Sequence, residues 1–387
     1  MRYGLMQVLR GRAAQMELDT KQRIEPRPDR PDIIPAGIKD YQKQPLKFDK
    51  DVAALAPRRT DDKPYPLNDR IRPLIDRKEE IAQKLAERSA SQKGKPTQFF
   101  YNTGPIFEAA QKVGGLSKKE AREWMRDFAQ TYAATSPRTV TDQNLRNATL
   151  AMAKEARQIP VRQIMGKGTG GISEKGYPMM TGKGGIHGIL LDARRDGGLA
   201  AKRDTNPKPV TFADNVEGNL SGATIDTHAI RGALDALNEI DPGSIPKEWI
   251  KPKFRKQYAE DPTSLNPATM INDTLESATI DGVKKQVEYG PIADIYVAMG
   301  KKLNVSPAEA QSMGWFGSGD RTGLASESKT IVDLVNDRID VTAQLLGISN
   351  EEAARKLFRR EIPLASNPMG GLLMQGPGSG TGSEDFI

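Results

Sequence analysis

Hydrophobic and polar residues alternate with a helical period through much of the chain between residues 74 and 358. Residues 74–90 place Ile75, Ile81 and Leu85 on one face of a strongly charged segment. This spacing predicts a solvated helix that packs along one apolar stripe. The same period predicts further helices at 105–113, 117–135, 141–156, 330–346 and 349–358.

The segment 117–135 carries the clearest helix signals. Ser117 can cap the helix, and Glu120 stands at the capping-box position three residues later. Trp124, Phe128 and Tyr132 follow one another at intervals of four residues and so share one face. We expect this aromatic stripe to be core; the alternative is a platform on which bases stack.

Residues 166–198 contain eleven glycines, a density that suits close backbone approach or a phosphate cradle. The Walker pattern fails, because Gly176 and Gly182 are separated by one residue too many. Gly184 also stands where Ser or Thr would bind Mg²⁺. The segment therefore predicts no nucleotide-binding loop.

Within this insertion, 184–193 resembles a Gly-hydrophobic-Gly hairpin that grips a DNA backbone, with an extra residue between its glycines. Such a hairpin would bind nucleic acid through Lys183, Gly185 and Gly188. The alternative is a mobile surface loop.

The stretch 218–237, GNLSGATIDTHAIRGALDAL, predicts a polar turn, a short apolar approach and an amphipathic helix. Asp226 or Thr227 can cap that helix by accepting a hydrogen bond from a backbone N–H of its first turn. Helix capping alone therefore explains an aspartate at this position, and no catalytic role is needed to account for it.

Residues 241–264 interleave aromatic and basic side chains around Trp249, Phe254 and Tyr258. Lys251, Lys253 and Arg255 could hold single strands or phosphates beside these rings. The interpretation we favour is that the segment is an irregular insertion anchored to the core by its aromatic residues.

The composition excludes several kinds of covalent cross-link and metal site. The 387 residues include no Cys and two His, which excludes disulfides, iron–sulfur clusters, thiolate zinc sites and His-rich metal sites. We expect no metal and no cofactor. No run approaches the roughly 20 apolar residues of a membrane span, and the first residues lack the features of a signal peptide. The net charge of +7 is compatible with DNA or another anionic partner.

The two ends are poor in core-forming residues. Residues 1–73 hold nine of the 26 prolines, and the last residues are rich in Gly, Ser and Pro. We expect extended arms at 1–73 and 359–387, with a disordered tail as the alternative. The predicted organisation is an arm at 1–73, a charged helix and linker at 74–95, a helical domain at 96–346 with the insertion 166–198, and a C-terminal helix and tail at 347–387.

Residues 289–316 predict two helices, the second capped by Ser306 before Pro307. They contain a Tyr-Gly-x-x-Ala-x-x-Tyr motif from Tyr289 and a Pro-x-Glu-x-Gln-Ser-x-x-Trp motif that ends at Trp315. Together with the Asp-Thr-His-Ala step at Asp226, these motifs resemble a family of uncharacterised proteins of tailed phages and prophages. That family in turn resembles the helix-hairpin-helix DNA glycosylase superfamily. The likeness covers roughly residues 99–316.

The resemblance implies a mainly α, glycosylase-like body flanked by the extended arms. It also implies that Asp226 corresponds to the catalytic carboxylate of the glycosylases. Lys208, eighteen positions earlier, would correspond to the Schiff-base lysine of those that cleave abasic sites. The Leu-Pro-Gly-hydrophobic-Gly hairpin around that lysine is missing, which favours a surface lysine. His228 is expected to pack or cap beside Asp226.

Two functions of different classes follow. The favoured one is a structural or interaction protein of a phage particle, such as a portal, head-tail or internal component. Its arms at 1–73 and 359–387 would bind neighbouring virion proteins in a larger assembly, and its body would contact those proteins or DNA. It would be found in the particle, and in the host cytoplasm during assembly. The alternative is an active DNA glycosylase or AP lyase that uses Asp226.

Overall fold

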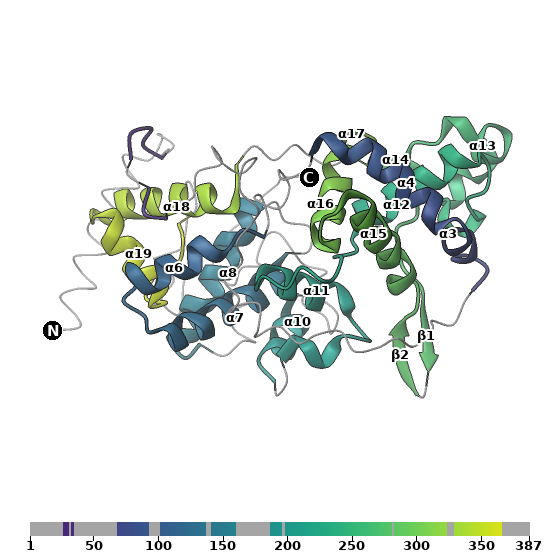
Figure 1. Cartoon of the computed structure of the whole chain (residues 1–387). Helices are drawn as coiled ribbons and strands as arrows, with labels where there is room; N and C mark the ends of the chain where they lie inside the picture. The colour runs from purple at the N-terminus through teal and green to yellow at the C-terminus, as the bar shows by residue number, and fades with distance from the viewer. Residues whose placement is uncertain are drawn as a thin grey trace, which may run out of the picture. The chain divides into compact units, whose positions relative to one another are not determined.

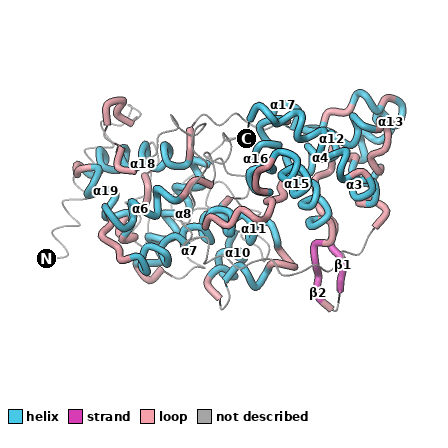
Figure 2. The backbone as a smooth tube through the Cα atoms, in the orientation of Figure 1, coloured by secondary structure: helices cyan, strands magenta, loops and turns pink. Residues whose placement is uncertain are grey.

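The structure, a computed structural model, describes residues 26–30, 32–34, 68–92, 101–136, 141–159, 186–195, 198–280, 282–322 and 329–365. Within these residues it is mainly helical and contains one antiparallel sheet of two strands (Figures 1 and 2). The predicted mainly α class is confirmed. The glycosylase-like arrangement of the helices remains a prediction.

The chain divides into two compact units. Unit 1 comprises Met1–Pro35, Glu108–Ala193 and Asp333–Ile387, and unit 2 comprises Ala36–Phe107 and Arg194–Val332. Each unit is thus assembled from segments that are far apart in the sequence. The sequence pattern had instead indicated one helical domain over 96–346.

Unit 1 is built from helices. Its helices, in chain order, are the last residues of α6 (Gly104–Lys112), then α7 (Lys118–Thr135), α8 (Thr141–Ala156), α10 (Ile186–Ala193), α18 (Ile331–Leu346) and α19 (Asn350–Phe358). Helix α7 packs against both α8 and α10.

The aromatic stripe of α7 forms the core of this unit. Ser117 and Glu120 make the predicted capping box at its start. Trp124, Phe128 and Tyr132 are at most 3 % exposed. The Trp124 and Phe128 rings stack with centroids 5.2 Å apart, and the Phe128 and Tyr132 rings with centroids 5.5 Å apart. The prediction of a core stripe is confirmed, because buried rings cannot serve as a platform for bases.

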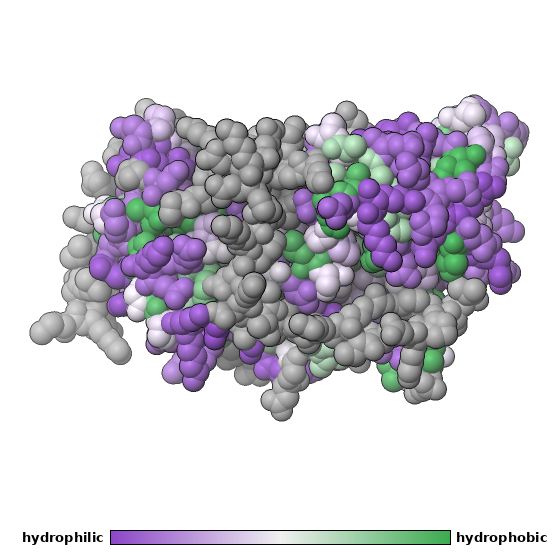
Figure 3. Space-filling view, in the orientation of Figure 1, coloured by the Kyte–Doolittle hydropathy of each residue, from purple (hydrophilic) through white to green (hydrophobic). Residues whose placement is uncertain are grey.

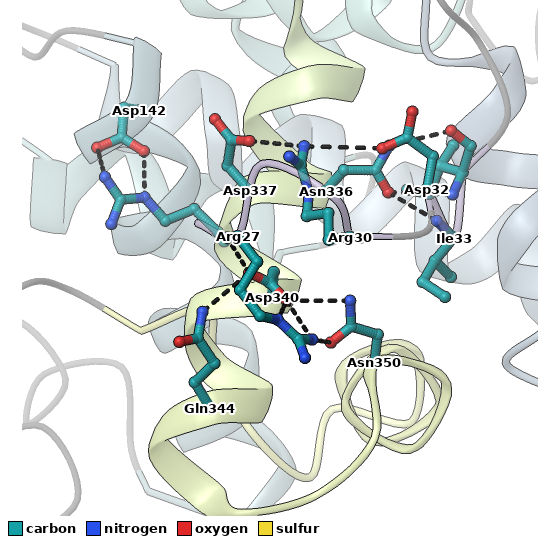
Figure 4. Close-up of polar contacts among 12 residues, drawn as sticks. Arg27, Arg30, Asp32, Ile33, Asp142, Asn336, Asp337, Asp340, Gln344 and Asn350 are labelled. Atoms are coloured by element: carbon teal, nitrogen blue, oxygen red, sulfur yellow. Dashed lines mark hydrogen bonds and ion pairs between the residues drawn. The ribbon is translucent and has the colours of Figure 1, made fainter. Parts of the chain in front are cut away.

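Two parts of the expected arms pack within unit 1. Residues 26–30 and 32–34 lie against α18 and α19, where Ile34 is fully buried (Figure 4). After α19, the Leu364 N–H donates to Thr149 Oγ1, and the Ala365 N–H donates to Thr342 Oγ1. These parts of the expected arms are therefore without helix or strand, except that the last turn after α19 continues to residue 362, and they pack on helices of unit 1. The rest of both arms lies outside the described residues, apart from 68–73.

Unit 2 holds more elements, most of them helical. Its α-helices are α3 (Arg72–Asp76), α4 (Lys78–Ser89), α11 (Pro207–Val216), α12 (Thr227–Ile240), α13 (Arg255–Glu260), α14 (Pro267–Met270), α15 (Tyr289–Leu303), α16 (Pro307–Gly317) and α17 (Gly319–Thr322). Its short 3-10 turns are η2 (Ala90–Gln92), η4 (Gly198–Lys202), η5 (Lys247–Trp249), η6 (Pro252–Phe254) and η7 (Pro262–Ser264). Its strands, β1 (Ser277–Ile280) and β2 (Val283–Gln286), pair Ser277 with Gln286.

The core of unit 2 lies where α4, α12, α15 and α16 pack together. The predicted helix over 74–90 is present as α3 and α4, which are separated at Arg77. Ile81 and Leu85 of its apolar stripe are fully buried. Residues 68–73, assigned to the arm, also belong to this unit, since Ile71 is 1 % exposed.

The β1–β2 hairpin was not predicted. Its strands are only four residues long. Residues 277–280 alternate between exposed and partly buried positions, but so short a stretch does not stand out as a strand pattern, and residues 283–286 do not alternate. Gly282, with φ of 75°, takes the left-handed conformation in the turn between them.

Candidate functional site around Asp226

Asp226 is the N-cap of α12. Its backbone is extended, and its Oδ1 accepts a hydrogen bond of 2.9 Å from the Ala229 N–H. Of the two residues predicted to cap this helix, the structure therefore selects Asp226. The negative charge also lies at the positive end of the helix dipole.

Trp315 provides a second donor to the same carboxylate. Its indole Nε1–H lies 3.0 Å from Asp226 Oδ1 and comes from the last turn of α16, 89 residues later in the chain. No described residue donates a hydrogen bond to Asp226 Oδ2. One carboxylate oxygen is thus held twice by the fold, and the other is left for solvent or a ligand.

Two tyrosines of α15 fasten the segments on either side of Asp226. The Tyr289 hydroxyl accepts from the Ile225 N–H at 3.1 Å and donates to the Ala223 carbonyl at 3.2 Å. The Tyr296 hydroxyl donates to the Ala229 carbonyl at 2.8 Å, in the first turn of α12. The aromatic residues of both later motifs therefore bond to Asp226 or to the backbone just before and after the Asp-Thr-His step, which gives a physical reason for the three motifs to be present in one chain.

Glycines allow Tyr296 to reach this position. A Cβ added at Gly314 of α16 would lie 3.0 Å from Tyr296 Cε1, and one added at Gly232 of α12 would lie 3.4 Å from its hydroxyl. The ring of Tyr296 consequently fills the space where α12, α15 and α16 approach one another.

Phenols close to the carboxylate stay neutral at ordinary pH. Burial, with a smaller contribution from the Asp226 charge, raises the pKa of Tyr101 to about 12. Burial and then the same charge raise the pKa of Tyr296 as well. Both phenols are therefore protonated at neutral pH, so neither acts as a base in this site.

His228 lies beside Asp226 without bonding to it. Its Nδ1 is 3.3 Å from Thr322 Oγ1, and its ring meets Trp315 edge to face at a centroid distance of 6.4 Å. This agrees with the expected packing role. The arrangement provides no imidazole that would relay a proton to or from the carboxylate.

Lys208 is the second residue of α11 and is partly buried. It makes no hydrogen bond or ion pair with any described residue, and so none with Asp226. The structure therefore shows no direct contact between Lys208, the predicted Schiff-base lysine, and the Asp226 carboxylate.

Of the predicted nucleic-acid residues of the glycine-rich insertion, the structure describes Gly188. Gly188 lies inside helix α10 of unit 1, so the hairpin and the surface loop are both wrong for 186–193. The run of apolar residues after Gly185 favours a helix over a turn. Lys183 and Gly185 lie outside the described residues.

Two of the three basic residues at 251–255 support their own loop. Lys251 Nζ donates to the Thr269 carbonyl at 2.8 Å, and Arg255 Nε donates to the Lys247 carbonyl at 3.0 Å. Lys253 Nζ lies 4.8 Å from the centroid of the Phe254 ring. Figure 3 shows hydrophilic residues over the outer side of this region, around α13. The side-chain nitrogens of Lys251 and Arg255 thus already make hydrogen bonds within the fold. Nucleic-acid binding by the three basic residues remains a prediction.

The aromatic residues of the same segment are anchors. Trp249 is fully buried, its Nε1–H donates to the Arg70 carbonyl at 2.9 Å, and the Arg70 guanidinium lies 3.6 Å from its ring centroid. The Tyr258 hydroxyl donates to Asn238 Oδ1 at 2.6 Å. The anchoring interpretation is confirmed for these two rings, which are not available to stack on bases.

Sequence reasoning singled out Asp226 but gave no role at the site to Tyr289, Tyr296 or Trp315. All three stand in the two motifs quoted above, Tyr-Gly-x-x-Ala-x-x-Tyr and Pro-x-Glu-x-Gln-Ser-x-x-Trp, which could have pointed to them. In the described part of the chain, no cluster of His, Asp and Glu is arranged to hold a metal ion. No helix among those residues is long and apolar enough to span a membrane.

Comparison of the chain with models of protein families, with curated proteins and with solved structures finds no match. The resemblance to phage proteins and to helix-hairpin-helix glycosylases therefore rests on the sequence motifs alone.

Proposed function

We propose that this chain is a structural and interaction protein of a tailed-phage particle, whose helical unit around Asp226 is a glycosylase-like body without catalytic activity. In this proposal unit 2 is a rigid module, and segments outside the two helical bodies contact neighbouring virion proteins or packaged DNA.

The observation that carries the proposal is the commitment of Asp226 to the fold. A single oxygen accepts hydrogen bonds from the Ala229 N–H and from the Trp315 indole, which joins the start of α12 to the end of α16. This structural task accounts for the aspartate without a reaction. Lys208, the nominated nucleophile, forms no bond with it.

Composition supports the assembly part of the proposal. Nine of the 26 prolines lie in residues 1–73, and residues 370–383 are dominated by Gly, Ser and Pro. Segments of this kind bury little of themselves, so they bind by wrapping a partner. The structure already contains one such contact, since residues 26–34 dock on α18 and α19.

The test compares the wild-type protein with Asp226→Asn on duplexes that contain uracil, oxoguanine or an abasic site. We expect no base release or strand cleavage above that of the variant. In parallel, quantitative mass spectrometry of purified particles should find the chain at a fixed copy number. Cleavage that disappears in Asp226→Asn would overturn the proposal.

The alternative is an active glycosylase, and one observation favours it. Asp226 Oδ2 accepts no hydrogen bond from a described residue, whereas Oδ1 is fixed by two donors. A carboxylate with one anchored and one open oxygen is suited to activate water or to stabilise an oxocarbenium-like sugar. Activity that depends on Asp226, without the chain in mature particles, would select this function.

A further inference from the structure

The short N-terminal stretches 26–30 and 32–34 occupy a polar site formed by α18 and the start of α19 within unit 1 (Figure 4). Arg27 makes the main contact. Its Nε donates to Asp340 Oδ1 at 2.9 Å, its Nη2 donates to the same oxygen at 2.6 Å, and its backbone N–H donates to Asp340 Oδ2 at 2.7 Å. The fork of Arg27 and its own amide thus enclose one carboxylate.

Arg30 makes the second charged contact. Its Nη2 lies 2.6 Å from Asp337 Oδ1, and both side chains are largely buried, at 15 % and 9 % exposed. A more exposed carboxylate, that of Asp32, lies 3.7 Å from the same nitrogen. The spacing of the two arginines matches the spacing of two carboxylates on adjacent turns of α18.

Asn336 binds the backbone that follows. Its Oδ1 accepts from the Ile33 and Ile34 N–H groups at 3.2 and 3.0 Å, and its Nδ2 donates to the Ile34 carbonyl at 3.0 Å. The Ile34 side chain is fully buried. The site therefore recognises two arginines, an extended backbone and one apolar side chain.

Side chains of α18 and α19 themselves orient the Asp340 carboxylate. Gln344 Nε2 donates to Asp340 Oδ2 at 2.9 Å, and Asn350 Nδ2 donates to Asp340 Oδ1 at 3.2 Å. These amides orient the carboxylate but bring no positive charge. The Asp340 side chain is fully buried in the docked state, so the site needs a cationic occupant.

The segment has little structure of its own. Among the described residues its internal backbone hydrogen bond is the turn from Arg30 N to Arg27 O, at 3.3 Å. Its partners lie 302 to 323 residues later in the chain. Residues 35–67 separate it from the next described residue in the sequence, and a chain of that length can span at most roughly 110 Å. Chain continuity therefore does not dictate which copy supplies the segment.

We propose that α18 and α19 form a docking site for an Arg-x-x-Arg-x-x-Ile-Ile segment, and that its partner is a second copy of this chain, which supplies the same segment by exchange. An exchanged segment makes every contact that the chain's own segment makes, so the cost of exchange is small where copies are concentrated. The exchange deepens the proposed assembly role by naming one partner, and it rests on that role for its purpose. Its test involves neither particles nor Asp226, so either proposal can fail alone.

The first measurement uses the full chain with Arg27→Ala and Arg30→Ala, and a fluorescent peptide of residues 24–36. We expect saturable binding by anisotropy, lost when Asp340→Asn is added to the chain or when the peptide carries the same two alanines. The wild-type chain should bind the peptide at least about tenfold more weakly, because its own tethered segment competes at high effective concentration.

The second measurement mixes two full chains with complementary defects. One carries Arg27→Ala and Arg30→Ala, and the other carries Asp337→Asn and Asp340→Asn. In sedimentation, each chain alone should show no exchanged complex. The mixture should form a 1:1 complex. If the first chain loses its circular dichroism signal, Arg30→Ala alone replaces it. Absence of peptide binding to a folded chain overturns the docking site, and peptide binding without the mixed complex overturns the exchange.

Discussion

At the scale of single residues, Asp226 shows how one side chain fixes a corner of the fold. Its Oδ1 caps α12 through the Ala229 N–H and also accepts the Trp315 indole N–H. The first bond satisfies a backbone donor that a helix cannot pair internally. The second ties the cap to a helix that arrives from elsewhere in the chain.

Replacing Asp226 should separate these two contributions. We expect Asp226→Ala to lower the stability of unit 2 by about 2 kcal/mol, because it removes both a cap and a tertiary hydrogen bond. Asp226→Asn keeps an oxygen acceptor and should cost less. Urea unfolding followed by circular dichroism measures both.

Ser306→Ala is the matched control, since Ser306 caps α16 through the Glu309 N–H without a second donor. It should cost about 1 kcal/mol. Equal losses for Asp226→Ala and Ser306→Ala would contradict a structural role for the Trp315 bond.

At the scale of elements, α12, α15 and α16 meet around one ring. The Tyr296 hydroxyl bonds to the Ala229 carbonyl, and its ring lies against Gly314. Protein cores are packed to crystal-like density, so an added methyl group at this point must displace the ring or the helix.

Gly314→Ala should therefore destabilise unit 2 by roughly 1–3 kcal/mol. In a Tyr296→Leu background the ring is gone, and the same substitution should cost clearly less. Tyr296→Phe keeps the ring and should leave the cost unchanged. A double-mutant cycle from urea midpoints gives the coupling, and no difference between the Leu and Phe backgrounds would argue against this contact.

At the scale of the whole molecule, ion pairs hold the N-terminal segment on unit 1. Burial pushes the pKa of Asp340 upward, but hydrogen bonds from Arg27 and Asn350 and the Arg27 charge outweigh it, so the pKa lies below its usual 3.8. A carboxyl group with a lowered pKa in the docked state contributes its full stability above its ordinary pKa. That contribution is lost as the pH falls through the lowered value.

Docking of residues 26–34 should accordingly be insensitive to pH from neutral down to about 4 and should weaken below it. Hydrogen exchange at the Ile33 and Ile34 amides, bonded to Asn336, reports the docked state. The Asp340→Asn chain should be less protected at neutral pH and should change less on acidification. Circular dichroism at each pH confirms that the helices persist. Protection that disappears between pH 7 and 5 would show that another group controls docking.

Much of the secondary structure follows from local sequence. Ser117 with Glu120, Ser306 with Pro307 and Ser349 each mark the start of an observed helix, and the stripe from Trp124 to Tyr132 is core. Caps and amphipathic periods act over a few residues, so they are readable in one dimension. The hairpin at 277–286 was missed because its strands are four residues long, too short for an alternation to stand out.

The sequence by itself determined the helical class, several helix starts, the absence of cysteine chemistry and a helix cap at Asp226 or Thr227. Only the tertiary structure decided which donors meet Asp226, where Tyr296 packs and where residues 26–34 dock. Those contacts join residues 67 to more than 300 positions apart, and they depend on which helix faces approach one another. A local sequence pattern does not specify which helix faces pack together, because many apolar faces could pack against the same helix face.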